Sequence, residues 1–117
     1  MPFDTLFHED RESNKLIGIV RFEKIDVQKR TAEIGYFLNA SYWGRGLMTE
    51  TVTCLSDLAL TAMGMERIIL IAHLENEASI RVAEKSGFKL VSRFKGADRY
   101  TRTMRDYLRF EKEENCE

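Results

Sequence analysis

The chain has 117 residues, so we expect a single domain over residues 1–117. Hydrophobic residues make up 44% of the sequence and charged residues 32%, a composition typical of a globular protein with an apolar core. The formal net charge of −1 lacks the basic excess of proteins that bind nucleic acids or membrane surfaces, so neither is an expected partner.

The cysteines and histidines indicate no disulfide framework and no metal site. Cys54 falls within a predicted helix and Cys116 near the end of the sequence, so a reducing, cytoplasmic setting is expected. His8 and His73 lie too far apart, and too short of partners, to suggest metal ligation. No apolar run approaches the roughly 18 residues of a membrane span, and the first residues lack the pattern of a signal peptide.

The N-terminal third of the chain predicts strands. Residues 3–8 alternate weakly and form a possible short strand. Residues 15–25 and 31–38 are rich in β-branched and aromatic residues, and turn-forming residues separate them. These two segments therefore predict an antiparallel hairpin.

The middle of the chain predicts a βαβ unit. Apolar residues recur every three or four positions over 47–63, which predicts a helix with one buried face, and Gly64 follows as a left-handed terminal residue. The apolar run RIILIA at 67–72 suits a strand that is covered on both faces and pairs in parallel. A strand, a helix and a parallel strand in this order are joined by a right-handed crossover.

The remaining segments complete a mixed sheet. Asn76 is a good N-cap and Gly87 a good terminal residue for a helix over 77–86, and strands are predicted at 88–94 and 105–112. The expected fold is α/β (α+β): a mixed, mostly antiparallel sheet with a central parallel βαβ unit and two helices.

The stretch YWGRG at 42–46 comes directly before the first predicted helix. The first amides of a helix have no partner within the helix, and glycines let a ligand approach them, so this loop could hold a phosphate or pyrophosphate. A plain strand-to-helix turn is the alternative, and for a lone G-x-G it is the favoured one. The loop matches neither the P-loop nor the dinucleotide fingerprint.

Four stretches in order resemble the GNAT superfamily of acetyl-CoA-dependent N-acetyltransferases, in particular the branch that acetylates ribosomal-protein N-termini and similar amines. The stretches run roughly from Lys15 to Phe110 and read LIGIVRFEKID, AEIGYFLNASYWGRGLMTE, NEASIRVAEKSGF and RFKGADRY followed by RDYLRF. The family usually begins with a further strand and two helices, so the resemblance implies a GNAT-like fold that lacks this N-terminal part. The acceptor site would then be incomplete or completed by a second chain, and we expect a homodimer.

The resemblance implies acetyl-CoA as co-substrate and assigns residues to it. Main-chain groups of Phe37 and Leu38 would pair with the pantetheine arm, Asn76 would contact the arm near the thioester, and Lys85 could meet the adenosine phosphates. Backbone amides would hold the pyrophosphate, namely those of Trp43, Gly44, Arg45, Gly46, Leu47 and Met48. Trp43 and Met48 depart from the residues usual at their positions, but their expected contacts are through the backbone.

The implied chemistry is direct attack of a neutral amine on the thioester, which requires a base for the amine proton. Asp98 and, ranked slightly lower, Glu33 are the candidate bases. Each has an equally probable structural interpretation, Asp98 as a turn residue and Glu33 as a paired strand acid. Many relatives place a tyrosine acid at the position of Ala83, so Ser79, near the sulfur, is the candidate donor to the thiolate.

The sequence therefore leaves three functions open. The first is an N-acetyltransferase that acts on a protein or peptide N-terminus, such as that of a ribosomal protein, or on a small amine. The second is a non-catalytic acyl-CoA-binding or interaction module with an incomplete acceptor site. The third, a plain structural domain, leaves the glycine loop and the NEAS…EKSGF stretch unexplained.

Overall fold

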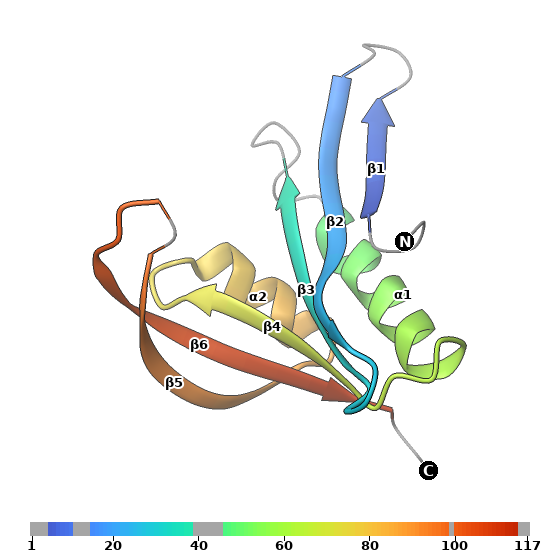
Figure 1. The fold of residues 1–117 in the computed structure, drawn as a ribbon. Helices are drawn as coiled ribbons and strands as arrows, with labels where there is room; N and C mark the ends of the chain where they lie inside the picture. The colour runs from blue at the N-terminus through green and yellow to red at the C-terminus, as the bar shows by residue number, and fades with distance from the viewer. Residues whose placement is uncertain (1–4, 11–14, 39–45, 99, 115–117) are drawn as a thin grey trace.

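The computed structural model describes residues 5–10, 15–38, 46–98 and 100–114, which form six strands and two helices (Figure 1). In chain order the elements are β1 (Thr5–Asp10), β2 (Lys15–Asp26), β3 (Thr31–Leu38), α1 (Leu47–Thr61), β4 (Arg67–His73), α2 (Glu77–Lys85), β5 (Lys89–Ala97) and β6 (Met104–Glu113). Every element predicted from the sequence is present, with boundaries that differ by three residues or fewer. None of the described helices is long and apolar enough to cross a bilayer.

The six strands form one sheet in the order β1-β2-β3-β4-β6-β5. Strands β3 and β4 pair in parallel through the α1 crossover, and the other neighbours pair antiparallel. The predicted hairpin is the β2–β3 pair. The structure thus confirms a mostly antiparallel sheet around a central βαβ unit.

The central parallel pairing of β3 with β4 is short, and the two strands separate beyond it. Three residue pairs join β3 to β4, and the last of them is Glu33 with Ile69. Beyond this point β3 remains paired to β2 as far as Leu38, whereas β4 remains paired to β6 as far as His73. Figure 1 shows the two strands diverging, so the sheet splits into two halves at one end.

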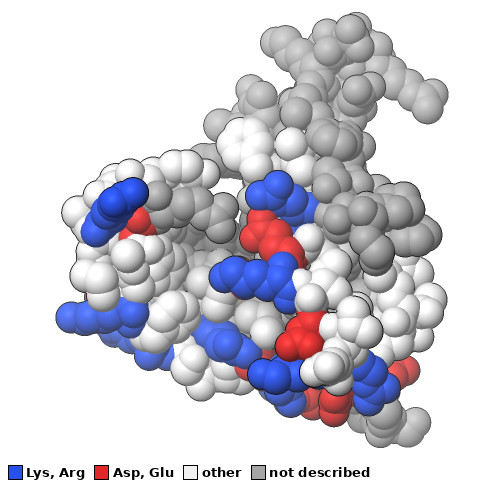
Figure 2. Space-filling view, viewed as in Figure 1, with Lys and Arg blue, Asp and Glu red and all other residues white. Residues whose placement is uncertain are grey.

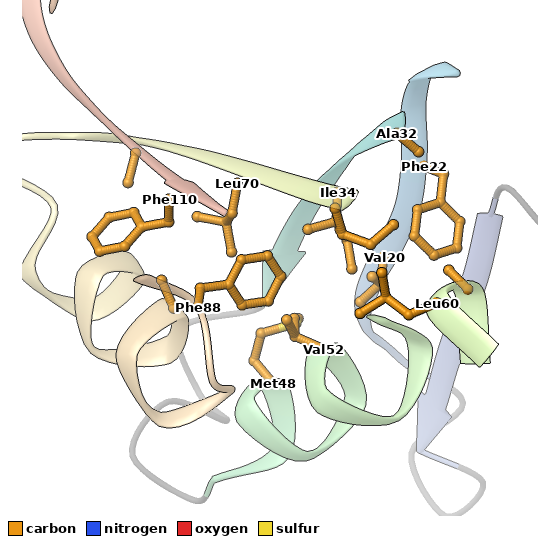
Figure 3. Close-up of a cluster of buried hydrophobic side chains, with 14 of the residues drawn as sticks. Val20, Phe22, Ala32, Ile34, Met48, Val52, Leu60, Leu70, Phe88 and Phe110 are labelled. Carbon is orange, nitrogen blue, oxygen red and sulfur yellow. The ribbon is translucent and has the colours of Figure 1, made fainter. Parts of the chain in front are cut away.

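Both helices pack on the same face of the sheet, where the apolar core lies (Figure 3). The sheet contributes alternate residues of its strands to one cluster, because successive strand side chains point to opposite faces. Helix α1 adds Met48 and Val52, α2 adds Ala83, and Phe88 follows α2. The buried strand side chains are Val20, Phe22, Ala32, Ile34, Ile68, Leu70, Ala72, Leu108 and Phe110.

The expectation that strand 67–72 is covered on both faces is wrong. In β4 the buried residues Ile68, Leu70 and Ala72 alternate with residues that are only partly buried, because both helices lie on one side. The uncovered face carries cross-strand ion pairs instead, such as Lys24 with Glu33 at 3.4 Å and Arg67 with Glu111 at 3.1 Å. Figure 2 shows acidic side chains lying between basic ones over the middle of this face.

Glycines end the helices as the sequence predicts. Gly64, with φ of 70°, and Gly87, with φ of 90°, both occupy the left-handed region. After α1 the amide of Met65 donates to the carbonyl of Ala59 across this glycine, which satisfies a carbonyl of the last turn. The last turn is tightened in this way, so α1 ends at Thr61 rather than at residue 63.

Candidate functional site

A cavity of about 550 Å³ lies where β3 and β4 separate. Its volume is in the range of sites for small molecules and cofactors. Residues from both halves of the sheet and from the start of α2 line it, among them Glu33, Phe37, Ile71, His73, Asn76 and Ser79.

The edge of β3 that faces β4 is open along this cavity. From Ile34 to Leu38 the strand has β2 on one side, and the β3–β4 ladder has already ended at Glu33. A strand edge of this kind offers backbone N–H and C=O groups to an extended ligand, which can add to the sheet as a further strand. Phe37 and Leu38, which were predicted to contact a pantetheine arm, belong to this open edge.

The start of α2 closes one end of the cavity. The Asn76 side chain accepts a hydrogen bond from the Ser79 amide at 3.1 Å, which confirms the predicted N-cap. The Asn76 amide donates to the carbonyl of His73 at 3.0 Å, so the cap is tied to the end of β4. Asn76 and Ser79 thus have fixed positions on the cavity wall.

Tyr36 is a cavity residue that sequence analysis did not single out. Its hydroxyl donates to the backbone carbonyl of Ser79 at 3.4 Å, and burial raises the pKa of Tyr36. The phenol therefore keeps its proton at neutral pH beside the start of α2. No sequence signal could have identified it, because the residue occupies an ordinary β-strand position and α2 meets it only in the folded chain.

The two candidate bases have different surroundings. Glu33 lines the cavity, and its side chain is 18% exposed beside the largely exposed Lys24. Asp98 follows β5 and uses Oδ1 to accept from the amides of Tyr100 at 2.8 Å and Thr101 at 3.0 Å. These backbone hydrogen bonds to Thr101 and Tyr100 lower the pKa of Asp98, so its carboxylate is a weaker base than an ordinary aspartate.

The first turn of α1 lies on the helix side of the sheet, and its first amides have no acceptor within the helix. Gly46, with φ of 74°, occupies the N-cap position, and it supplies no side-chain hydrogen bond to the helix. A Cβ added at Gly46 would meet no atom within 4 Å, so the space beside it is open. Leu47 is partly exposed and Met48 is buried in the core, so Met48 can offer a ligand only its backbone. Three further residues of the predicted loop, Trp43, Gly44 and Arg45, lie outside the described residues.

Lys85 lies at the other end of α2, close to this turn. The hydroxyl of the next residue, Ser86, donates to the carbonyl of Thr49 at 3.3 Å, which joins the end of α2 to the first turn of α1. The start of α2 thus faces the cavity, and its end lies by the first turn of α1. In the described part of the chain, no three His, Cys, Asp or Glu side chains are grouped to hold a metal ion.

Comparisons with known proteins agree with this architecture. The model of the acetyltransferase (GNAT) domain matches residues 3–89. An uncharacterized N-acetyltransferase of Bacillus subtilis (strain 168) is 33% identical over 69% of this chain and 46% of its own length. The ribosomal-protein-serine acetyltransferase of Escherichia coli (strain K12) is 31% identical over 80% of this chain and 50% of its own length.

A solved structure has the same fold. The crystal structure of ribosomal-protein-S5-alanine acetyltransferase from Vibrio fischeri superposes with a TM-score of 0.83 and 25% identity, over 90% of this chain and 58% of that chain. The chain spans about half the length of the curated relatives it matches.

Proposed function

Because this chain belongs to the GNAT family of acetyltransferases, we propose that it transfers an acetyl group from acetyl-CoA to a primary amine. The observation that carries the proposal is the open edge of β3 in the cavity between the two halves of the sheet. A ligand bound there is extended, pairs through its amide groups, and ends beside the start of α2. The pantetheine arm of coenzyme A has this chemistry, because it is a linear chain with two amides and a terminal sulfur.

The other end of the cofactor binds at α1 in this proposal. The pyrophosphate accepts hydrogen bonds from the backbone amides of the loop from Trp43 to Met48, and the helix dipole adds to the attraction. The left-handed Gly46 and the absence of a side-chain cap in the helix support this role. Lys85, next to the Ser86–Thr49 contact, is available to the adenosine phosphates.

The reaction is direct attack of the amine nitrogen on the thioester carbonyl. Glu33 faces the acceptor from the cavity wall, where its carboxylate attracts the ammonium form and can take its proton through water. Asp98 remains a second proposed participant, although two backbone amides hold its Oδ1. The Ser79 hydroxyl donates to the departing thiolate, supported by its position one turn into α2.

The proposed acceptor is the N-terminus of a protein or peptide, such as that of a ribosomal protein. Two relatives support this class of acceptor by their names, which are ribosomal-protein-serine acetyltransferase and ribosomal-protein-S5-alanine acetyltransferase. We also propose a cytoplasmic homodimer. Exposed apolar side chains on the edge strand β5, Leu90, Val91 and Phe94, support association between copies, and light scattering after size exclusion tests it.

Calorimetric titration with acetyl-CoA is the first test of the proposal. We expect binding by the wild-type chain and at least about tenfold weaker binding by Gly46→Val, because a β-branched residue is strained at positive φ and distorts the cradle. Gly64→Val is the matched control, since it has the same strain at the far end of α1. Equal affinity in wild type and Gly46→Val contradicts the phosphate site.

Thiol release from acetyl-CoA with a panel of peptides and small amines is the second test. Turnover on any of them supports the transferase. Binding of acetyl-CoA without turnover on every amine favours the non-catalytic acyl-CoA-binding module.

A further inference from the structure

We propose that His73, in place of Glu33, takes the proton of the acceptor amine and that Asp98 acts through His73 as a positioning residue. The inference rests on the proposed acetyl transfer and names a further catalytic residue for it. It is carried by the geometry at the end of β4, where His73 lines the cavity and the Asp98 carboxylate lies 3.8 Å from its Nε2.

His73 is held on the cavity wall by its neighbours. Its ring lies 4.6 Å from the ring of Tyr107, the residue opposite it on β6, and Tyr107 is in turn stacked on Phe94 at 5.5 Å. The carbonyl of His73 accepts from the Asn76 amide, so the strand end and the α2 cap share one anchor. The imidazole thus has a defined orientation at the edge where β3 and β4 separate.

The two ring nitrogens have different roles. Nδ1 is buried and has no hydrogen-bond partner among the described residues, so it is closed to proton exchange with a ligand. Nε2 is the remaining site of proton transfer, and 35% of the side chain is exposed. Nε2 can accept a proton only in the neutral tautomer that carries its hydrogen on Nδ1, and the proposal uses this tautomer.

Asp98 is arranged to stabilise the protonated ring. Its Oδ1 is held by the amides of Tyr100 and Thr101, and its Oδ2 lies 3.8 Å from His73 Nε2 and 3.6 Å from Arg105 Nε. Both Oδ2 contacts are longer than a hydrogen bond, so the carboxylate acts on the ring by its charge. An aspartate with this set of partners remains ionised and favours an imidazolium beside it.

The proton and the electron pairs balance in the transfer. The amine nitrogen forms the new bond to the acetyl carbon, the carbon–sulfur bond breaks, and its electrons leave on the thiolate. His73 Nε2 takes one hydrogen of the attacking nitrogen. The imidazolium then releases this proton to solvent, while the thiolate is protonated by Ser79 or by water.

Other charged and titratable groups surround His73. Arg105 opposes the imidazolium, whereas Glu33, across the cavity on β3, favours it. The remaining groups that face the same cavity are Arg21, Glu23, Tyr36, Tyr100 and Tyr107. Asp98 is distinguished from them as the carboxylate within 4 Å of Nε2 among the described residues.

The test compares kcat/KM against pH for wild type, His73→Gln, His73→Phe and Asp98→Asn. His73→Phe retains a ring to stack on Tyr107, and Asp98→Asn retains the Oδ1 acceptor of the turn while removing the charge. Both His73 variants should lose about 10²–10⁴-fold in kcat and lose the ascending limb of the profile. Asp98→Asn should lower kcat and leave KM nearly unchanged, because the imidazolium formed in the transfer has lost its stabilising anion. Imidazole added to His73→Ala should restore part of the rate.

Each outcome separates the inference from the proposed function. Acetyl-CoA affinity, measured by calorimetry, should change far less than kcat in these variants, since the proposed cofactor contacts lie on β3, α1 and α2. A wild-type rate and limb in His73→Gln overturn the base assignment and leave the acetyltransferase intact. Loss of the limb in Glu33→Gln but not in His73→Gln assigns the proton to Glu33 instead. A wild-type chain that binds acetyl-CoA but turns over no amine contradicts the transferase itself, and the base role with it.

Discussion

The two ends of the central strand pair differ in what satisfies their backbone and side chains. At the closed end, Ala32 pairs with Ile68 and both side chains enter the core beneath the sheet. At the open end, β3 and β4 are no longer paired with each other, and in the described part of the chain β3 pairs with β2 and β4 with β6. One parallel pair therefore serves stability at one end and offers an unpaired edge at the other. Substitutions at the two ends should have separable effects.

The largest expected effect is on the core beneath β4. Leu70→Ala removes a side chain that is 1% exposed and should lower the free energy of unfolding by about 2–5 kcal/mol, because it leaves a cavity among Phe110, Phe88 and the helices. Urea denaturation followed by circular dichroism measures this change in the free energy of unfolding. Leu58→Ala on α1, where the side chain is 45% exposed, is the control and should cost less than half as much.

A smaller loss of stability is expected at the contact between β6 and α1. Lys112 donates to the buried Ser56 hydroxyl at 2.9 Å and pairs with Asp57 at 2.9 Å, and its side chain is only 11% exposed. Lys112→Met keeps the stem but removes the donor, and should lower the free energy of unfolding by about 1–3 kcal/mol. Lys89→Met, at an exposed position of β5, should leave the unfolding midpoint in urea nearly unchanged.

At the open end, loss of the α2 cap should affect both stability and ligand binding. Asn76→Ala removes the acceptor for the Ser79 amide and should lower the free energy of unfolding by about 1 kcal/mol. It should also weaken acetyl-CoA binding in calorimetry, because the start of α2 borders the cavity. Asn76→Ser keeps a capping oxygen and should recover the stability. An unchanged affinity in both variants would remove Asn76 from the cofactor site.

The smallest expected effect is a loss of stability at acidic pH when the Asp98 carboxylate in its turn becomes protonated. The pKa of Asp98 is lowered in the folded chain, so its contribution to stability is present above its ordinary value of 3.8 and is lost as the pH falls further, through the folded value. Thermal unfolding should therefore show a steeper loss of stability below about pH 4 for wild type than for Asp98→Asn. Parallel curves for the two proteins would show that the turn gains nothing from the ionised carboxylate.

The sequence by itself determined the elements and much of their arrangement. Apolar spacing over residues 47–63, the cap at Asn76 and the glycines at 64 and 87 all act locally, through neighbouring residues, so their structures can be predicted without the fold. The parallel pairing of β3 and β4 also followed, because a strand, a helix and an apolar strand permit few topologies.

Only the tertiary structure decided which side chains meet. Both helices lie on one face, so the apolar run of β4 is buried on alternate residues rather than on both sides, which no local pattern reveals. The contact of Tyr36 with Ser79 and the approach of Asp98 to His73 join residues that are 43 and 25 positions apart. Such contacts depend on where the strands separate and how the β5–β6 hairpin returns, and these are properties of the packed sheet as a whole.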